Sequence, residues 1–158
     1  MKVKIISLLL LFSMCSTNST EDTYIEVSNN DFLNLRTIQN NEKVTTDSNL
    51  VIVNFWASWC LECIEEHELL ISLSEIPELK NKILLVSFQD SKDNAITFLN
   101  KYGYGEITYV MDENSKFSIN AGVFGVPETH IIKNNKIIKK YIGPLSFKDF
   151  QEIIDLYS

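Results

Sequence analysis

The sequence has few of the residues that nucleic-acid-binding or disordered proteins need. Its 14 Lys and Arg residues are outnumbered by 21 Asp and Glu residues, and the net charge of −7 leaves no basic cluster for phosphate groups, so we expect no nucleic-acid partner. Only five glycines and three prolines occur, without a low-complexity run, which argues against extensive intrinsic disorder. The composition, 45% hydrophobic over 158 residues, suffices for one well-packed domain, which we place at residues 21–158.

A long hydrophobic run is also missing. Lys2 and Lys4 precede an apolar run from Ile5 to Cys15, which is about half of the roughly 20 residues that a membrane-spanning helix needs. We therefore expect residues 1–20 to be a signal peptide or a short membrane anchor of an exported, periplasmic protein, tethered to the inner membrane if the anchor is retained. Whether the leader is cleaved, retained or lipidated at Cys15 stays open.

Cysteine is scarce, and the mature chain keeps only Cys60 and Cys63 if the leader is removed. Two cysteines separated by two residues close too short a loop to stabilise a fold, so we expect a chemical role. A zinc site would need His67 and His130 to converge on this pair, and haem attachment would need His in place of Ile64. We therefore expect neither a metal nor another cofactor.

Strand and helix patterns alternate from Leu50 onward. The run Leu50–Trp56 is apolar and β-branched, as in a strand buried on both faces. In the segment that follows, Ile64 and three leucines form an apolar stripe, and we expect the glutamates at positions 62, 65, 66 and 68 to lie mostly away from it. We predict strands over 50–56, 83–88, 107–111, 128–133 and 136–142, helices over 61–74, 94–102, 115–121 and 147–157, and an N-terminal extended segment or hairpin from 24–27, 32–38 and 44–46.

This order of elements is that of a thioredoxin fold, an α/β fold with a central mixed sheet flanked by helices, here with an N-terminal β extension. The fold places Cys60 where the first core strand ends and a helix begins, so that free backbone N–H groups and the helix dipole stabilise its thiolate. Cys63, one turn later, can attack the mixed disulfide that Cys60 forms with a partner. The sequence therefore predicts a redox-active Cys60–Cys63 disulfide.

A second informative segment precedes the strand at 128–133. In residues 122–129, two glycines bracket an apolar pair, and Pro127 stands at the strand entrance, where the missing N–H group of proline is tolerated. We predict a cis Val126–Pro127 peptide bond, which would expose the Val126 backbone to an extended substrate beside Cys60. Trp59, Val126 and Pro127 are the predicted substrate-binding residues.

The segments NFWASWCLEC, IEEH and GVFGVPETHI resemble TlpA-type thioredoxins, most closely the CcmG/DsbE cytochrome c biogenesis proteins. The resemblance implies an exported reductant that receives electrons from a membrane thiol-disulfide donor. It implies that these electrons reach the haem-attachment cysteines of apocytochrome c, or a haem-lyase or chaperone partner that holds them. It also implies catalytic roles for Glu66 and Glu128, because a carboxylate near a dithiol disfavours the thiolate and can relay a proton.

Several alternatives remain open at this stage. Leu61 and Ile64 depart from the family pattern, and a TlpA-like thiol reductase for another exported substrate is one alternative. A non-catalytic module that holds an apocytochrome or a copper ion is a second, and it predicts that Cys63 is dispensable. An oxidant like DsbA is a third. Typical thioredoxin and DsbA reduction potentials differ by about 150 mV, and a few charges near the dithiol could not easily close that gap. In every case we expect a monomer, with His67 and His130 as structural or surface residues.

Overall fold

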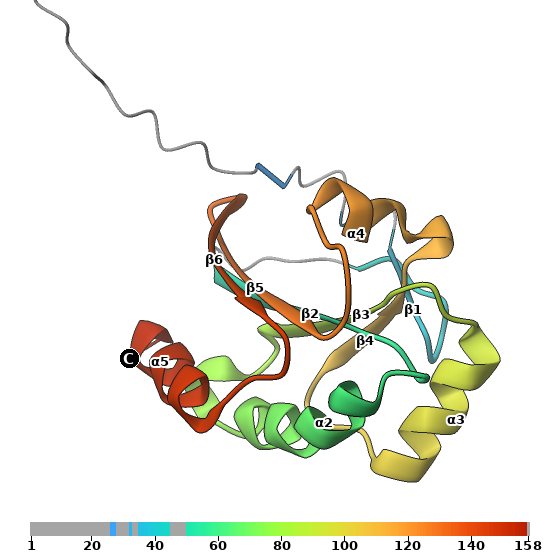
Figure 1. Ribbon diagram of the computed structural model, residues 1–158, viewed down its shortest axis with the longest axis horizontal. Helices are drawn as coiled ribbons and strands as arrows, with labels where there is room; N and C mark the ends of the chain where they lie inside the picture. Colours follow the sequence, from blue (N-terminus) through green and yellow to red (C-terminus); the bar gives the residue numbers. More distant parts are fainter. Residues whose placement is uncertain (1–25, 28–31, 33–34, 45–49, 158) are drawn as a thin grey trace, which may run out of the picture.

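The computed structural model describes residues 26–27, 32, 35–44 and 50–157 (Figure 1). The predicted leader, residues 1–20, lies outside the described residues, as do positions 24–25, 33–34 and 45–46 of the predicted N-terminal strands. Within the described part of the chain, no helix is long and apolar enough to cross a membrane.

Six strands form one mixed sheet in the order β1-β4-β3-β2-β5-β6. The three central strands are parallel, whereas each of the others runs antiparallel to its neighbour. This arrangement confirms the predicted thioredoxin fold. In the N-terminal β extension, β1 pairs with β4 at one sheet edge, and Glu26 forms a bridge with Lys136 of β6 at the other. The strands are β1 (Arg36–Thr37), β2 (Leu50–Trp56), β3 (Ile83–Ser87), β4 (Thr108–Met111), β5 (Glu128–Lys133) and β6 (Lys136–Ile142).

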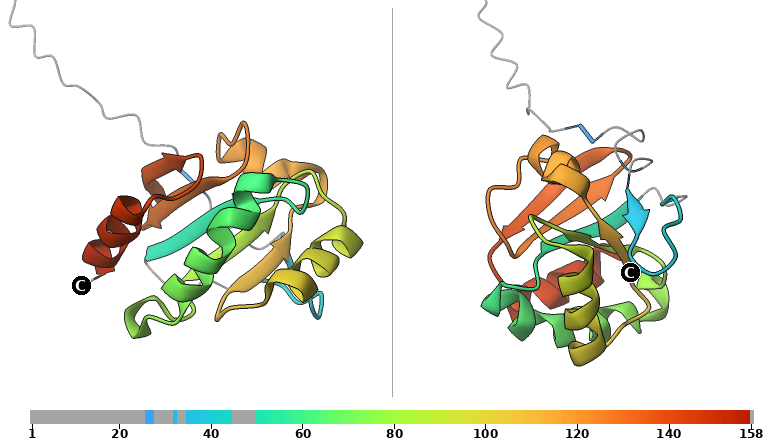
Figure 2. Two further views of the ribbon diagram at one scale, coloured as in Figure 1. Left: turned by 60° about the horizontal axis from the view of Figure 1, so that its bottom comes forward. Right: turned by 90° about the vertical axis from the view of Figure 1, so that its right-hand side faces the viewer.

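Helices cover both faces of the sheet. In the right-hand view of Figure 2, α4 lies above the sheet, whereas α2, α3 and α5 lie below it. The described helices are α2 (Leu61–Ser74), α3 (Lys92–Tyr102), α4 (Lys116–Asn120) and α5 (Phe147–Tyr157), with short 3₁₀ turns η1 (Pro77–Leu79) and η2 (Glu113–Ser115).

Strand β2 is buried on both faces, as its apolar run predicts. Ile52 and Trp56 pack into the hydrophobic cluster beneath α2, α3 and α5. Val53 and Phe55 pack into the cluster on the α4 side. Because successive side chains of a strand point to opposite faces, this one strand contributes to both cores and lies in the middle of the sheet.

The predicted boundaries differ from the observed ones where local capping decides them. Helix α3 begins at Lys92, two residues before the predicted start, because the Ser91 side chain caps it by accepting the Asn94 backbone N–H at 3.2 Å. The predicted helix over 115–121 is divided between η2 and α4, because Asn114 and Ser115 have left-handed backbone angles, with φ of 58° and 52°.

The central position of β3 leads to a stability prediction. Leu85 is fully buried in the cluster on the α2 side, so Leu85→Ala leaves a cavity in a close-packed core. We expect this change to lower the free energy of unfolding by about 2 to 5 kcal/mol in urea denaturation. The matched control is Leu156→Ala, because Leu156 is 43% exposed on α5, and its loss should stay below about 1 kcal/mol. Equal losses from the two changes would contradict this account of the core.

Candidate active site

Cys60 and Cys63 form a disulfide at the start of α2. Cys60 is the N-cap residue, with extended backbone angles, and its Sγ accepts the Cys63 backbone N–H at 3.1 Å. The predicted location of Cys60 at a helix N-terminus is therefore confirmed. A thiolate formed on Cys60 lies among the unpaired N–H groups of the first turn, which stabilise negative charge.

The residues on either side of Cys60 are exposed while both cysteines are buried. Trp59 is 59% exposed and Leu61 is 65% exposed, and both are large and apolar. The indole Nε1–H of Trp59 donates to the Gln89 carbonyl at 3.1 Å. This bond connects the segment before Cys60 to the loop that follows β3, and it fixes the place of the exposed indole beside the disulfide.

The loop before β5 contains the predicted cis Val126–Pro127 peptide bond. Pro127 is buried, and its carbonyl accepts the Gly143 backbone N–H at 2.9 Å. Val126 is half-buried and packs against both hydrophobic clusters. Phe124, two residues earlier, is 96% exposed. Sequence reasoning missed Phe124, although a phenylalanine between two glycines was a signal for an exposed apolar side chain.

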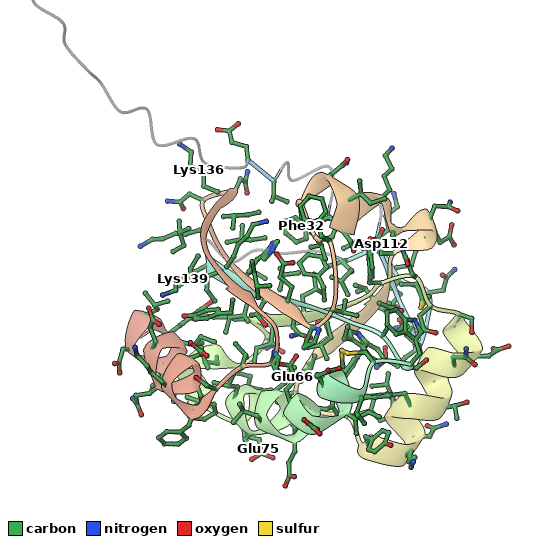
Figure 3. The ribbon with its side chains drawn as sticks, viewed as in Figure 1. Phe32, Glu66, Glu75, Asp112, Lys136 and Lys139 are labelled. Atoms are coloured by element: carbon green, nitrogen blue, oxygen red, sulfur yellow. A yellow bond between two sulfur atoms is a disulfide. The ribbon has the colours of Figure 1, made fainter. Side chains whose placement is uncertain are left out.

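Glu66 lies on the buried face of α2, between the helix and the sheet (Figure 3). The prediction that the glutamates of this helix lie mostly away from the apolar face is wrong for this residue. Its Oε1 accepts a bond from Asn54 Nδ2 at 2.8 Å, and its Oε2 accepts the Leu145 backbone N–H at 2.9 Å. Burial raises the pKa of Glu66 from 4.5 to about 7, against the opposing effect of these two bonds.

Asn54 connects this carboxyl group to the sheet, and sequence reasoning missed it. Its Nδ2 also donates to Thr129 Oγ1 at 2.9 Å, and the two residues are cross-strand partners on β2 and β5. An asparagine inside an otherwise apolar strand was the available signal, because a buried amide needs polar partners. Asn54 and Thr129 thus form a fully buried polar link that connects β2 and β5 to Glu66 of α2.

Glu128 lies on the opposite face of the sheet from Glu66. It is the cross-strand partner of Phe55, whose side chain packs on the α4 side, and directly opposed residues share a face. Its Oε1 lies 2.6 Å from His130 Nε2 and 3.6 Å from Lys140 Nζ. The structure therefore does not bring the two predicted catalytic carboxylates together, and their roles stay predictions.

The two histidines occupy different faces as well. His67 is on α2, with its Nε2 3.0 Å from the Gly103 carbonyl and its ring against Phe98. His130 is on β5 and packs edge-on against Phe55. Burial lowers the pKa of both imidazoles, which favours their neutral forms.

In the residues that the structure describes, no group of three His, Cys, Asp or Glu side chains is arranged to hold a metal ion.

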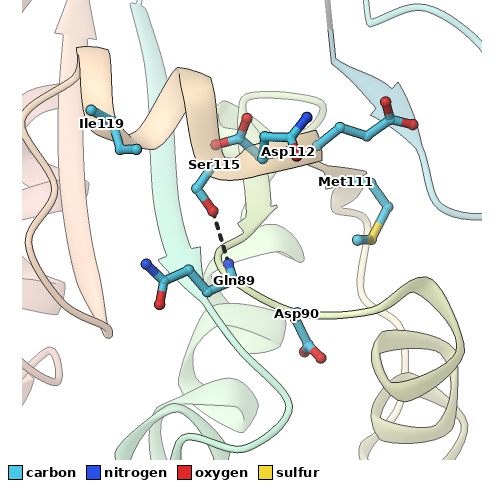
Figure 4. Close-up of a pocket in the computed structure, with 8 residues that line it drawn as sticks. Gln89, Asp90, Met111, Asp112, Ser115 and Ile119 are labelled. Atoms are coloured by element: carbon cyan, nitrogen blue, oxygen red, sulfur yellow. Dashed lines mark hydrogen bonds between the residues drawn. The ribbon is translucent and has the colours of Figure 1, made fainter.

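A pocket of about 500 Å³ adjoins the dithiol segment at the carboxyl ends of β3 and β4 (Figure 4). The loop after β3 and the loop after β4 line this pocket, and they are joined by a hydrogen bond from the Gln89 backbone N–H to Ser115 Oγ at 3.0 Å. The Gln89 carbonyl also accepts the indole N–H of Trp59, so the loop after β3 contacts both the pocket and the exposed tryptophan. Its lining comprises Gln89, Asp90, Met111, Asp112, Glu113, Asn114, Ser115 and Ile119.

Comparison with known proteins identifies the family. The Redoxin family matches residues 26–154, which is most of the chain. The chain belongs to the Redoxin family. It is 30% identical over 105 residues to the thiol:disulfide interchange protein DsbE of Vibrio cholerae serotype O1, covering 66% of this chain and 55% of that protein. It is 36% identical over 96 residues to the thiol:disulfide interchange protein CycY of Rhizobium leguminosarum bv. viciae, covering 60% of this chain and 50% of that protein.

These matches confirm the resemblance to DsbE-type proteins that the sequence segments indicate. The chain spans between half and two thirds of the length of the curated relatives it matches. Among solved structures, MTB DsbF superposes with a TM-score of 0.68 at 17% identity, covering 84% of this chain and 99% of that one. The N-terminal domain of PilB from N. meningitidis superposes with a TM-score of 0.67 at 14% identity, covering 82% and 96%. These structural likenesses support the thioredoxin fold.

The raised pKa of Glu66 predicts a pH-dependent stability. Because the folded state holds this proton more tightly than the unfolded chain, the stabilisation is complete below pH 4.5 and is lost as the pH rises through about 7. We expect the oxidised wild type to lose up to about 3 kcal/mol more unfolding free energy than Glu66→Gln between pH 5 and pH 8.5. Urea denaturation at the two pH values measures this difference.

Glu65→Gln is the matched control, because Glu65 is the preceding residue of the same helix and is exposed. This change should leave the pH dependence of the wild type in place. If Glu66→Gln and the wild type lose equal stability across the range, then the buried carboxyl group does not titrate as described.

Proposed function

We propose that this chain is an exported thiol:disulfide oxidoreductase that acts as a reductant of the haem-attachment cysteines of apocytochrome c. The observation that carries the proposal is the Cys60–Cys63 disulfide at the N-terminus of α2. The thiol:disulfide interchange names of the matched relatives support it. The alternative of a TlpA-like reductase for another exported substrate rests on Leu61, which is exposed beside Cys60 where the resembled family carries proline.

The reaction begins with the reduced protein. The Cys60 thiolate attacks one sulfur of the substrate disulfide, forms a mixed disulfide and expels one substrate thiolate. Cys63, one helical turn away, then attacks the Cys60 sulfur, which closes the Cys60–Cys63 disulfide and releases the second substrate thiolate. Two electrons pass to the substrate in each cycle, and a membrane thiol-disulfide donor restores the dithiol.

In this proposal Glu66 accepts the proton of Cys63. It lies three residues after Cys63 and therefore on the same side of α2, and both side chains are buried. Cys63 must lose a proton before it can attack, and a base works best when its pKa lies near the operating pH. The pKa of Glu66, about 7, meets that condition. In this proposal Asn54 and the Leu145 backbone N–H hold the carboxyl group in place.

Charge near the dithiol favours a reducing protein. A strongly oxidising protein such as DsbA has its reduced form stabilised, whereas negative charge near a dithiol destabilises the thiolate of the reduced form. Glu62 lies between the two cysteines and is exposed, and Glu66, one turn beyond them, adds negative charge in its ionised form, above about pH 7. The dithiol therefore gives up electrons readily, as a reductant of exported apocytochrome requires.

Trapping the mixed disulfide tests this mechanism. The probe is a synthetic peptide whose Cys-x-x-Cys-His cysteines are joined by a disulfide. We expect reduced Cys63→Ser to accumulate a covalent adduct with this peptide, detected by intact mass spectrometry, and Cys60→Ser to give none. The wild type should return the reduced peptide and its own intramolecular disulfide. A wild type that leaves the peptide oxidised would contradict the proposal and favour a non-catalytic binding module.

A second peptide tests the substrate. It keeps the two cysteines and their spacing, but all the remaining residues of the haem-attachment segment are replaced. We expect the wild type to reduce the haem-attachment peptide at least about tenfold faster, because a specific site discriminates substrates in its transition state. Equal rates would favour a reductase for another exported substrate.

A further inference from the structure

The ammonium group of Lys140 contacts two backbone carbonyls and one carboxylate. Its Nζ donates to the Ala121 carbonyl at 2.9 Å and to the Gly122 carbonyl at 3.3 Å, and it lies 3.6 Å from Glu128 Oε1. The side chain of Lys140 is only 25% exposed. Two backbone carbonyls therefore accept hydrogen bonds from this ammonium group, and the Glu128 carboxylate adds an ion pair.

The three acceptors lie at the two ends of one loop. Ala121 and Gly122 follow α4, and Glu128 begins β5, so a single ammonium group joins both ends of residues 121–128. Between these ends the loop carries Phe124, which is 96% exposed, and the cis Val126–Pro127 bond. Lys140 therefore joins the two ends of the loop whose Val126 packs against the hydrophobic cluster that contains both cysteines.

The buried carboxylate of Glu128 makes this attachment hard to replace. Its side chain is 5% exposed, and its Oε1 is shared between Lys140 and His130. A buried carboxylate needs a paired cation and hydrogen-bond donors, because removal of one partner leaves an uncompensated charge. Burial favours the neutral form of His130, so the positive charge at this site belongs to Lys140.

We propose that Lys140 is a positioning residue, which holds the 121–128 loop in the conformation that receives a polypeptide disulfide beside Cys60. The proposal rests on the exchange activity proposed above, but not on apocytochrome c as the substrate. A small disulfide reacts with the dithiol without contacts to the loop, whereas a polypeptide disulfide also needs the loop. Lys140 should therefore affect the two kinds of substrate differently.

Lys139 provides a matched control. It is the preceding residue of β6, and its side chain points to the other face, where it pairs with Glu152 of α5. It is 39% exposed and contacts neither the loop nor Glu128 in any described interaction. Lys139→Met and Lys140→Met therefore remove the same group from neighbouring positions on one strand.

In the experiment each variant is reduced and then reacted with two oxidised probes. The probes are bis(2-hydroxyethyl) disulfide and the cyclic Cys-x-x-Cys-His peptide, and stopped-flow tryptophan fluorescence gives the second-order rate constants. We expect the ratio of the peptide rate constant to the small-disulfide rate constant to fall roughly tenfold or more in Lys140→Met, because a misplaced binding loop loses orientation of the substrate. Lys139→Met should keep the wild-type ratio, and Lys140→Arg, which retains the charge, should restore much of it.

Phe124→Ala tests the loop itself and does not depend on how well Lys140→Met folds. We expect this variant to lower the same ratio, because the loop acts through its exposed apolar side chain. An unchanged ratio in Phe124→Ala, or in a folded Lys140→Met, would overturn the proposal. Failure of the apocytochrome assignment gives a different result, since the haem-attachment peptide would then react no faster than its sequence-changed control in the wild type.

Discussion

Burial of β2 on both faces determines where in the fold the Cys60–Cys63 disulfide lies. Trp56, the last residue of this strand, packs beneath the helices, and the chain then leaves the sheet and enters α2 at Cys60 within four residues. The sulfur of Cys60 thereby becomes the acceptor for the Cys63 backbone N–H at the helix start. The neighbouring ends of β3 and β5 supply the Gln89 carbonyl that fixes Trp59 and the loop that contains the cis peptide bond. The chemistry of the site depends on this one central strand, because its two cores fix where the helix can begin.

Two buried carboxyl groups on opposite faces of the sheet are stabilised in different ways. Among the described residues, Glu66 accepts hydrogen bonds from two neutral donors, Asn54 and the Leu145 backbone, and burial raises its pKa to about 7. Glu128 has a cation, Lys140, within 3.6 Å. A carboxyl group that gains and loses its proton near neutral pH suits proton exchange with a buried thiol, whereas a carboxylate paired with an ammonium group suits attachment of a loop. In our proposals the same residue type therefore serves two purposes on the two sides of β2.

Much of this fold follows from local pattern in the sequence. The doubly buried run at β2, the helix N-terminus at Cys60 and the cis bond before Pro127 were predictable, because each depends on a few consecutive residues. The burial of Glu66 was not, since the apolar stripe of α2 gives no sign of the amide on β2 that receives its carboxyl group. The face of Glu128 depends on register, because a shift of one residue reverses every side chain of a strand. The hydrogen bonds of Lys140 to the carbonyls of residues 121 and 122 connect β6 to the end of α4. No local sequence pattern predicts that these two elements lie close together.

The central claim is that the Cys60–Cys63 couple is reducing. Its reduction potential can be measured by equilibrating the purified protein with thiol buffers of known poise and quantifying the reduced fraction. The account predicts a value at or below the range of about −200 to −230 mV that is typical of glutaredoxins. A value near that of DsbA, about −120 mV, would contradict it and would identify the chain as an oxidant or an isomerase.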